Sequence, residues 1–170
     1  MLILRPPVLS DESILRLADV ELERDGSNFL LDGYQDTEID FQDYLDRVEN
    51  SRLGVNLLPG RVPSTFLLAI VDGEIVGRTS IRHELNEWLS DFGGHIGYAV
   101  RPDFRRRGYA SEILAQSLSI ASELGITNVL MTCNDDNQAS IKVIEKHGGR
   151  IDNKVDYDGT ILRRYWIKNF

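Results

Sequence analysis

The spacing of apolar residues predicts two helices near the start of the chain. The first runs through residues 14–23, follows the candidate N-cap Ser10, ends at Asp25-Gly26, and buries a face with helical spacing that includes Ile14, Leu17 and Ala18. The second begins after Asp40, an expected N-cap, and shows the stripe Phe41, Tyr44, Leu45 and Val48. Residues 31–34 and 58–60 are polar or glycine-containing and are typical of loops.

The pattern changes near Pro63, where short apolar runs bounded by turn residues begin. The turn dipeptides Asp72-Gly73 and Asp158-Gly159 predict two hairpins. The predicted elements are strands 64–71 and 74–82, a short strand 95–100, a helix 108–124, a buried strand 128–133, a helix 139–147, and strands 150–157 and 161–168. This order indicates an α+β fold with a mostly antiparallel sheet and a central parallel βαβ unit flanked by helices. With no repeat and no long linker, we expect one domain over residues 1–170.

Composition narrows the class of protein. Hydrophobic residues make up 42% and charged residues 27%, which is ordinary for a soluble globular protein. No apolar run approaches the roughly 20 residues that span a bilayer, and the first ten residues are too short and too soon broken by proline for a signal peptide. The single cysteine, Cys133, excludes an internal disulfide, and with only three histidines we expect no metal site. We therefore expect a cytoplasmic protein that does not act on membranes.

Charge is unevenly distributed along the chain. Residues 1–60 hold 13 Asp/Glu and 5 Lys/Arg, whereas residues 61–170 hold 14 of each, which accounts for the net charge of −8. Nucleic-acid binding needs a basic surface, so the acidic front half argues against that partner. A cationic substrate suits it better. The alternative is an acidic helix face that is merely solvated.

Residues 100–111 (VRPDFRRRGYAS) concentrate the features of an anion-binding loop. Three consecutive arginines precede Gly108, Tyr109 and Ala110 at the start of a predicted helix. A glycine lets backbone approach a ligand closely, and free N–H groups at a helix start attract anions. Arginine adds permanently charged donors that suit phosphate. We interpret this loop as a pyrophosphate site, the alternative being an arginine-rich loop before an ordinary helix.

The loop and its neighbours resemble the GNAT superfamily of acetyltransferases. Residues 105–110 (RRRGYA) match that family's Q/R-x-x-G-x-G/A loop, residues 95–110 resemble its central motif, and residues 134–151 resemble the motif that follows. Residues 82–87 (RHELNE) are similar to those of a poorly characterised bacterial subgroup of predicted acetyltransferases. The resemblance covers residues 64–168. It implies a GNAT-like fold and acetyl-CoA as cosubstrate, held by Val100, Arg105, Arg106, Arg107, Gly108, Tyr109, Ala110, Ser111, Asn137 and Ser140. The alternative of a nucleotide-binding P-loop or Rossmann motif has no matching sequence.

The implied reaction transfers an acetyl group from acetyl-CoA to a primary amine by direct attack, without a covalent enzyme intermediate. The acceptor is a small-molecule or peptide amine that the sequence does not identify, and a homodimer stays open. One position departs from the family, because Ile144 stands where many relatives carry a tyrosine that protonates the leaving thiolate. Its absence motivates an alternative function, a non-catalytic acyl-CoA-binding regulatory module.

Three residues are candidates for acid–base chemistry. His95 stands where many relatives place a glutamate, and its ordinary pKa of about 6.5 suits a base at neutral pH. Glu84 precedes that strand and could act through water, and Tyr98 is a candidate acid or substrate-lining residue. Each has a structural alternative: a hydrogen-bonded strand histidine, an exposed loop carboxylate and a core aromatic. We interpret Cys133 as a packing residue.

Overall fold

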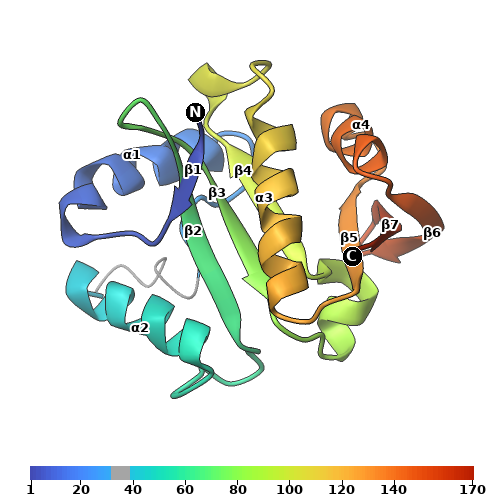
Figure 1. The fold of residues 1–170 in the computed structure, drawn as a ribbon, viewed down its shortest axis with the longest axis horizontal. Helices are drawn as coiled ribbons and strands as arrows, with labels where there is room; N and C mark the ends of the chain where they lie inside the picture. Colours follow the sequence, from blue (N-terminus) through green and yellow to red (C-terminus); the bar gives the residue numbers. More distant parts are fainter. Residues whose placement is uncertain (32–38) are drawn as a thin grey trace.

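The computed structural model describes residues 1–31 and 39–170, so most of the expected loop at residues 31–34 lies outside the described residues. Two sheets and four α-helices make up the described chain (Figure 1). No described helix is long and apolar enough to cross a membrane. The elements are β1 (Ile3–Arg5), η1 (Leu9–Asp11), α1 (Glu12–Glu23), α2 (Phe41–Leu53), β2 (Ser64–Val71), β3 (Glu74–Arg82), η2 (Leu89–Gly93), β4 (Ile96–Val100), η3 (Pro102–Phe104), α3 (Tyr109–Glu123), β5 (Asn128–Asn134), α4 (Gln138–Lys146), β6 (Arg150–Tyr157) and β7 (Thr160–Lys168).

The strands divide into a four-stranded sheet, β1-β2-β3-β4, and a three-stranded sheet, β5-β7-β6. Every ladder within them is antiparallel. The strand–helix–strand order of β4, α3 and β5 is as predicted, but these two strands share no ladder in the described chain. They meet where the His95 N–H donates to the Leu130 carbonyl at 2.7 Å. Each strand instead takes its ladder from the antiparallel neighbour on its other side, so the parallel pairing we expected is reduced to this junction.

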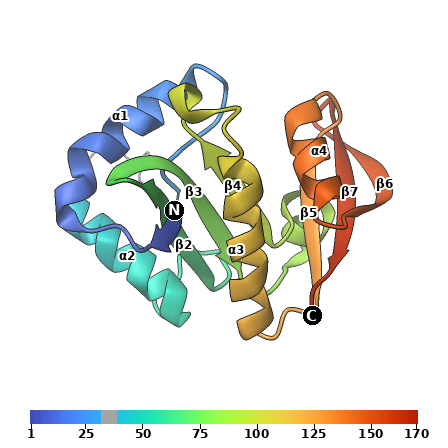
Figure 2. The ribbon, with the colours of Figure 1, turned by 45° about the horizontal axis from the view of Figure 1, so that its top comes forward.

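Alternation along β2 assigns helices to both faces of the four-stranded sheet. Phe66, Leu68 and Ile70 enter a core with residues of α1 and α2. Ala69, between them, points to the other face, where Val76 and Ile113 of α3 complete a second core. Figure 2 shows the result, with α1 and α2 on one side of the sheet and α3 on the other, between the two sheets. The β4–β5 junction therefore lies beneath α3.

The first helix differs from its prediction in start and orientation. It follows the turn η1, and its N-cap is Asp11, not Ser10. Its buried residues are Leu15, Ala18, Asp19 and Leu22, whereas Leu17 is 48% exposed. The helix takes this orientation because Asp19 is buried, with its Oδ1 accepting the N–H groups of Phe29 and Leu30 at 2.8 and 2.9 Å. A carboxylate with two backbone partners can occupy a core position that the apolar pattern assigns to other residues.

Local signals fixed several other elements correctly. The carboxylate of Asp40 accepts the Gln42 N–H at 2.7 Å and caps α2, as predicted. Both hairpin turns have two consecutive residues at positive φ, with Asp72 and Gly73 at 50° and 86°. That is the two-residue turn that the right-handed twist of the flanking strands favours. The strand β1 was not predicted, because three residues are too few to show a periodic pattern.

Candidate active site

One backbone edge of the strand β4 has no neighbouring strand in a ladder among the described residues. The Arg82 N–H donates to the His95 carbonyl at 2.7 Å, and the Arg101 N–H donates to the Val76 carbonyl at 2.9 Å. In an antiparallel ladder, alternate residues bond the same neighbour. The backbone groups of Ile96, Tyr98 and Val100 therefore point away from β3, toward the side on which β5 begins.

The strand β5 presents the matching edge. At its two ends, the Thr127 carbonyl and the Asp135 N–H bond to the β7 side. Because alternate residues bond the same neighbour, the backbone groups of the even-numbered residues face β4. Leu130 demonstrates this orientation, because its N–H and carbonyl both bond to His95. Beyond that junction the edges of Tyr98–Val100 and Thr132–Asn134 form no shared ladder in the part of the chain that the structure describes, and we call the gap between them the wedge. At its ends the Val100 carbonyl accepts from Arg105 Nε and the Asn134 carbonyl accepts the Asn137 N–H. Backbone edges that face no strand need a ligand or water to satisfy them.

A cleft of about 560 Å³ opens at the carboxyl ends of β4 and β5. The residues that line it come from α1 and the loop after it, β4, the arginine loop, and the first turns of α3 and α4. Nine of the ten cofactor candidates are among them: Val100, Arg105, Arg106, Gly108, Tyr109, Ala110, Ser111, Asn137 and Ser140. The tenth, Arg107, turns elsewhere. Its Nη2 donates to the Asp103 carbonyl at 2.9 Å and its guanidinium lies 5.5 Å from the Phe104 ring centroid.

The arginine loop enters α3 through Gly108, whose φ is 85°. Residues that carry a side chain rarely adopt this φ. A Cβ built at Gly108 meets no other atom within 4 Å. Gly108 is also the N-cap of α3 and offers no side-chain acceptor. The first N–H groups of the helix, at Tyr109 and Ala110, are therefore left for a ligand in the cleft. This arrangement suits an anion.

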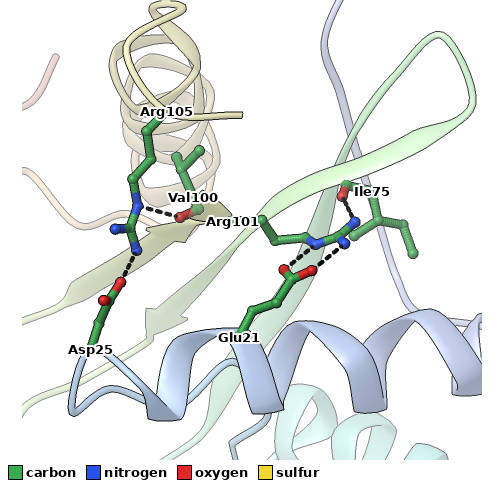
Figure 3. Close-up of polar contacts among 6 residues, drawn as sticks. All are labelled: Glu21, Asp25, Ile75, Val100, Arg101 and Arg105. Carbon is green, nitrogen blue, oxygen red and sulfur yellow. Dashed lines mark hydrogen bonds and ion pairs between the residues drawn. The ribbon is translucent and has the colours of Figure 1, made fainter. Parts of the chain in front are cut away.

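Two ion pairs fasten the end of α1 to the end of β4 (Figure 3). The Arg101 guanidinium binds both carboxylate oxygens of Glu21, at 2.8 and 2.9 Å, and donates to the Ile75 carbonyl at 2.9 Å. Arg105 donates from Nε to the Val100 carbonyl at 3.1 Å and pairs with Asp25 at 2.6 Å. Arg105 is thus held by protein groups at the rim of the cleft. Its Nε also fixes the orientation of the Val100 carbonyl.

Sequence reasoning missed Glu21, Asp25 and Arg101 as parts of the site. Glu21 and Asp25 belong to the acidic N-terminal segment. From composition alone, that segment could be either a solvated helix face or a surface for a cationic substrate. Their partners lie 80 residues further along the chain, so no local spacing signals the pairs. The pKa of Glu21 is lowered by its hydrogen bonds with Arg101.

Asn137 and Ser140 both lie at the start of α4. The side-chain oxygen of Asn137 accepts the Ser140 N–H at 3.1 Å and caps the helix. Ser111, across the cleft on α3, bonds through its hydroxyl to His147 Nε2 at 2.9 Å. The amide nitrogen of Asn137 is not used in the cap, so it is the part of that side chain that could serve a ligand.

Of the three acid–base candidates, Tyr98 is the one that lines the cleft. Its hydroxyl is buried and makes no hydrogen bond with any residue in the described ranges. Burial raises the pKa of this hydroxyl, and the side chain of Ser140, although it does not meet hydrogen-bond geometry, lies close enough to offset part of that rise. Ile144, which replaces the family's tyrosine, is 1% exposed and packs in the core beneath α4. Tyr98 therefore lines the cleft from a different element, and its buried hydroxyl is protonated at neutral pH.

His95 and Glu84 lie at the opposite end of β4 and outside the cleft lining. His95 is buried, and its Nδ1 accepts the Leu130 N–H at 2.9 Å. Burial lowers the pKa of this imidazole, and a neutral ring that accepts at Nδ1 carries its proton on Nε2. Neither nitrogen then has a lone pair free for a substrate proton. Glu84 is exposed at the end of β3. The geometry therefore favours the structural alternatives for both residues.

Cys133 is a partly buried packing residue. It is half-buried on β5 and packs against the core under α4. Burial raises the pKa of its thiol to about 11, so little thiolate exists at neutral pH. In the described residues, no group of three or more His, Cys, Asp or Glu side chains is placed to hold a metal ion.

The comparison with family models decides the identity of this arrangement. Residues 1–150 match the model of the acetyltransferase (GNAT) domain. The chain belongs to the GNAT acetyltransferase family. Among curated GNAT relatives, acetyltransferases of Pectobacterium atrosepticum and Photorhabdus laumondii are 33% and 32% identical over 88 residues, or 49% of this chain. Those alignments take in 56% and 55% of the relatives, so the chain spans about half the length of the curated relatives it matches.

Solved structures show the same GNAT fold. The yncA protein of Salmonella typhimurium, solved with its cofactor acetyl-CoA, superimposes with a TM-score of 0.68 at 14% identity, over 99% of this chain and 94% of that one. A Salmonella typhimurium enzyme that modifies the N-terminal serine of ribosomal protein L7/L12 gives 0.69 at 19% identity, over 98% and 94%. At such low identities the superpositions establish the fold alone, which is of the α+β class predicted from the sequence.

Proposed function

We propose that this chain, as a single GNAT domain in the cytoplasm, transfers the acetyl group of acetyl-CoA to a primary amine by direct attack. The observation that carries the proposal is the wedge, two strand edges that share no ladder in the described chain and open into a cleft with an arginine loop at a helix start. A ligand with amide groups along its length and phosphates at one end matches both features. Coenzyme A has this composition, with two amides in its pantetheine arm and a pyrophosphate beyond them.

The residues divide between positioning and chemistry. The pyrophosphate would lie on the amides of residues 108–110, and the pantetheine amides along the open edge of β4. The thioester carbonyl would then lie near the Val100 N–H, a donor for the oxyanion that forms on attack. Arg105 and Arg101 act indirectly, because they hold the end of β4 against α1. The acetyl-CoA complex of the yncA protein supports this choice of cofactor.

Over the reaction the acceptor nitrogen loses two protons, one before the attack and one after it, and the thiolate gains one. An alkyl ammonium has a pKa of about 10.4, so it must lose a proton before its nitrogen attacks the thioester carbon. Since His95 is committed to Leu130, we assign that proton to water in the wedge. The C–N bond forms, the C–S bond breaks, and the hydroxyl of Tyr98 donates a proton to the departing thiolate. The second proton lost by the nitrogen, as the amide forms, returns to the Tyr98 oxygen. Burial raises the pKa of this hydroxyl, so it carries its proton at neutral pH as a donor must, although the same shift makes it a weaker acid.

A second candidate function is a regulatory module that binds acyl-CoA without turnover. The burial of Ile144 in the core favours it, since the family's usual acid cannot act from that position. An assay of thiol release from acetyl-CoA over a panel of amines separates the two. Acetylated product with any amine supports the enzyme, and tight coenzyme A binding with no product from any amine supports the module.

The role of Tyr98 has its own test. Tyr98→Phe should lower kcat by about 10²-fold, at the lower end for general acid catalysis because a thiolate leaves readily. The KM for acetyl-CoA should stay close to the wild-type value. An unchanged kcat under conditions where chemistry limits the rate would remove Tyr98 from the mechanism.

A further inference from the structure

Three aromatic side chains form a cluster that the cofactor cleft does not use. Trp88 lies 6.3 Å from Phe92 and 6.0 Å from Tyr157, and Phe92 lies 4.7 Å from Tyr157, measured between ring centroids. Trp88 is 49% exposed and Tyr157 43%. The rings meet at tilted or edge-on angles, and such aromatic contacts normally bury their area in a core, whereas these present part of it to solvent. We call the three rings the aromatic platform.

The aromatic platform lies against β5, on the face away from α4. Thr132, on the β5 edge of the wedge, donates from Oγ1 to the Phe92 carbonyl at 2.8 Å. A second hydrogen bond runs from Arg164 Nη2, on β7, to the Ser90 carbonyl, also at 2.8 Å. On the opposite face of the same sheet, Tyr165 and Ile167 enter the core beneath α3 and α4. Figure 1 shows the light-green segment before β4 beside β5 and well apart from α4.

This placement gives the wedge two different sides. On one side, α3 and α4 supply much of the cofactor cleft. An acceptor that attacks a thioester held between the strands must then approach from the other side, because the cofactor fills the first. On this second side η2 packs against β5 and β6, and the aromatic platform consists of Trp88 at the N-cap of η2, Phe92 within η2 and Tyr157 of β6.

Carboxylates flank the aromatic platform in the chain. Glu87 precedes Trp88, Asp91 precedes Phe92, and Asp156 and Asp158 enclose Tyr157. All four acids are exposed. Within residues 1–31 and 39–170, no ion pair involves any of them. The nearby cation, Arg164, is 15% exposed in its side chain and is held by Asp152 and the Ser90 carbonyl.

We infer that the aromatic platform binds a second cationic group on the acceptor, separate from the amine that is acetylated. Aromatic faces attract ammonium and guanidinium groups, and the flanking carboxylates favour the same charge. The cation stays protonated while the other nitrogen reacts in the wedge. The inference rests on the proposed function and specifies its substrate class, a diamine or an amine-bearing segment with a basic residue.

Matched acceptors test the inference directly. 1,5-Diaminopentane and 1-aminopentane differ only in the second amine. A short peptide with lysine beside its free N-terminus and the same peptide with norleucine differ in the same way. We expect the wild type to give a higher kcat/KM with the dicationic member of at least one pair, and the preferred pair identifies the source of the cation. Trp88→Ala should raise the KM for that acceptor by roughly 2- to 30-fold, the range of one cation–π contact.

The controls keep this result distinct from a folding defect. Trp88→Phe should retain most of the preference. Trp166→Ala removes another partly exposed tryptophan, from β7 in the sheet that contains β5. This variant should keep the preference for the dicationic acceptor. The KM for acetyl-CoA should not change in any variant.

Two outcomes separate this inference from the proposed function. Turnover without a preference for either dicationic acceptor, or a preference that survives Trp88→Ala, overturns the aromatic platform while the acetyltransferase stands. If no amine is acetylated, the proposed function fails. Quenching of tryptophan fluorescence by 1,5-diaminopentane then decides the inference alone: quenching that Trp88→Ala abolishes supports it, and no quenching refutes it.

Discussion

Replacing His95 separates a structural histidine from a catalytic one. His95→Ala leaves the Leu130 N–H, on a residue with 0% exposure, without its acceptor. An unsatisfied buried donor costs about 1–3 kcal/mol, and the lost packing of the ring adds to this. We expect the free energy of unfolding to fall by roughly 2–4 kcal/mol, a drop in Tm of roughly 5–15 °C for a domain of this size.

The matched variant is His95→Asn, whose side-chain oxygen can take the position of Nδ1 and accept the same N–H. It should recover much of the stability at pH 7, and kcat/KM should stay near the wild-type value. Denaturant unfolding and steady-state kinetics on both variants make the comparison. A fall in kcat/KM of roughly 10²–10⁴-fold in both variants, with His95→Asn as stable as the wild type, would restore His95 as the base.

The pH dependence of stability gives an independent check. Burial lowers the pKa of His95 in the folded protein, so between that value and about 6.5 the unfolded chain binds more protons. The stabilising contribution is complete above about pH 6.5 and is lost as the pH falls toward the lower, folded pKa. His95→Asn should flatten this part of the profile. His83 and His147, whose pKa values are also lowered by burial, should keep the rest of the slope.

Three further predictions concern the cleft. Gly108→Glu should abolish coenzyme A binding in calorimetry, since it places a carboxylate at the anion site, whereas Gly125→Glu, with a similar φ at the other end of α3, should not. Glu21→Gln should lower the free energy of unfolding by roughly 2–3 kcal/mol at pH 7, because Arg101 stays buried without its counter-charge. The lowered pKa of Glu21 means that this contribution disappears as the pH falls below its ordinary range, so an equal loss at pH 3 would contradict the reasoning. Asn137→Ala should destabilise α4 by about 1 kcal/mol through its lost cap and raise the KM for acetyl-CoA, while Asn137→Ser should restore only the stability.

The sequence alone determined the elements whose causes are local. The β2–β3 hairpin has the predicted bounds, because a turn dipeptide at positive φ and two flanking apolar runs specify it within 19 residues. The same holds for the cap of α2 at Asp40 and for the arginine loop that opens α3 at Gly108. Glycine, capping and arginine chemistry act over a few bonds, so their spacing can be read directly.

Tertiary structure decided the features that depend on distant partners. The buried face of α1 follows from Asp19 and the backbone of Phe29 and Leu30, and hydrophobic periodicity carries no sign of that contact. His95 and Tyr98 lie three residues apart, yet a hydrogen bond to Leu130 engages the first and leaves the second to line the cleft. Whether two strands pair or diverge depends on what each already bonds on its other side. The outcome depends on many weak contacts between separate segments of the chain, and no local sequence pattern predicts it.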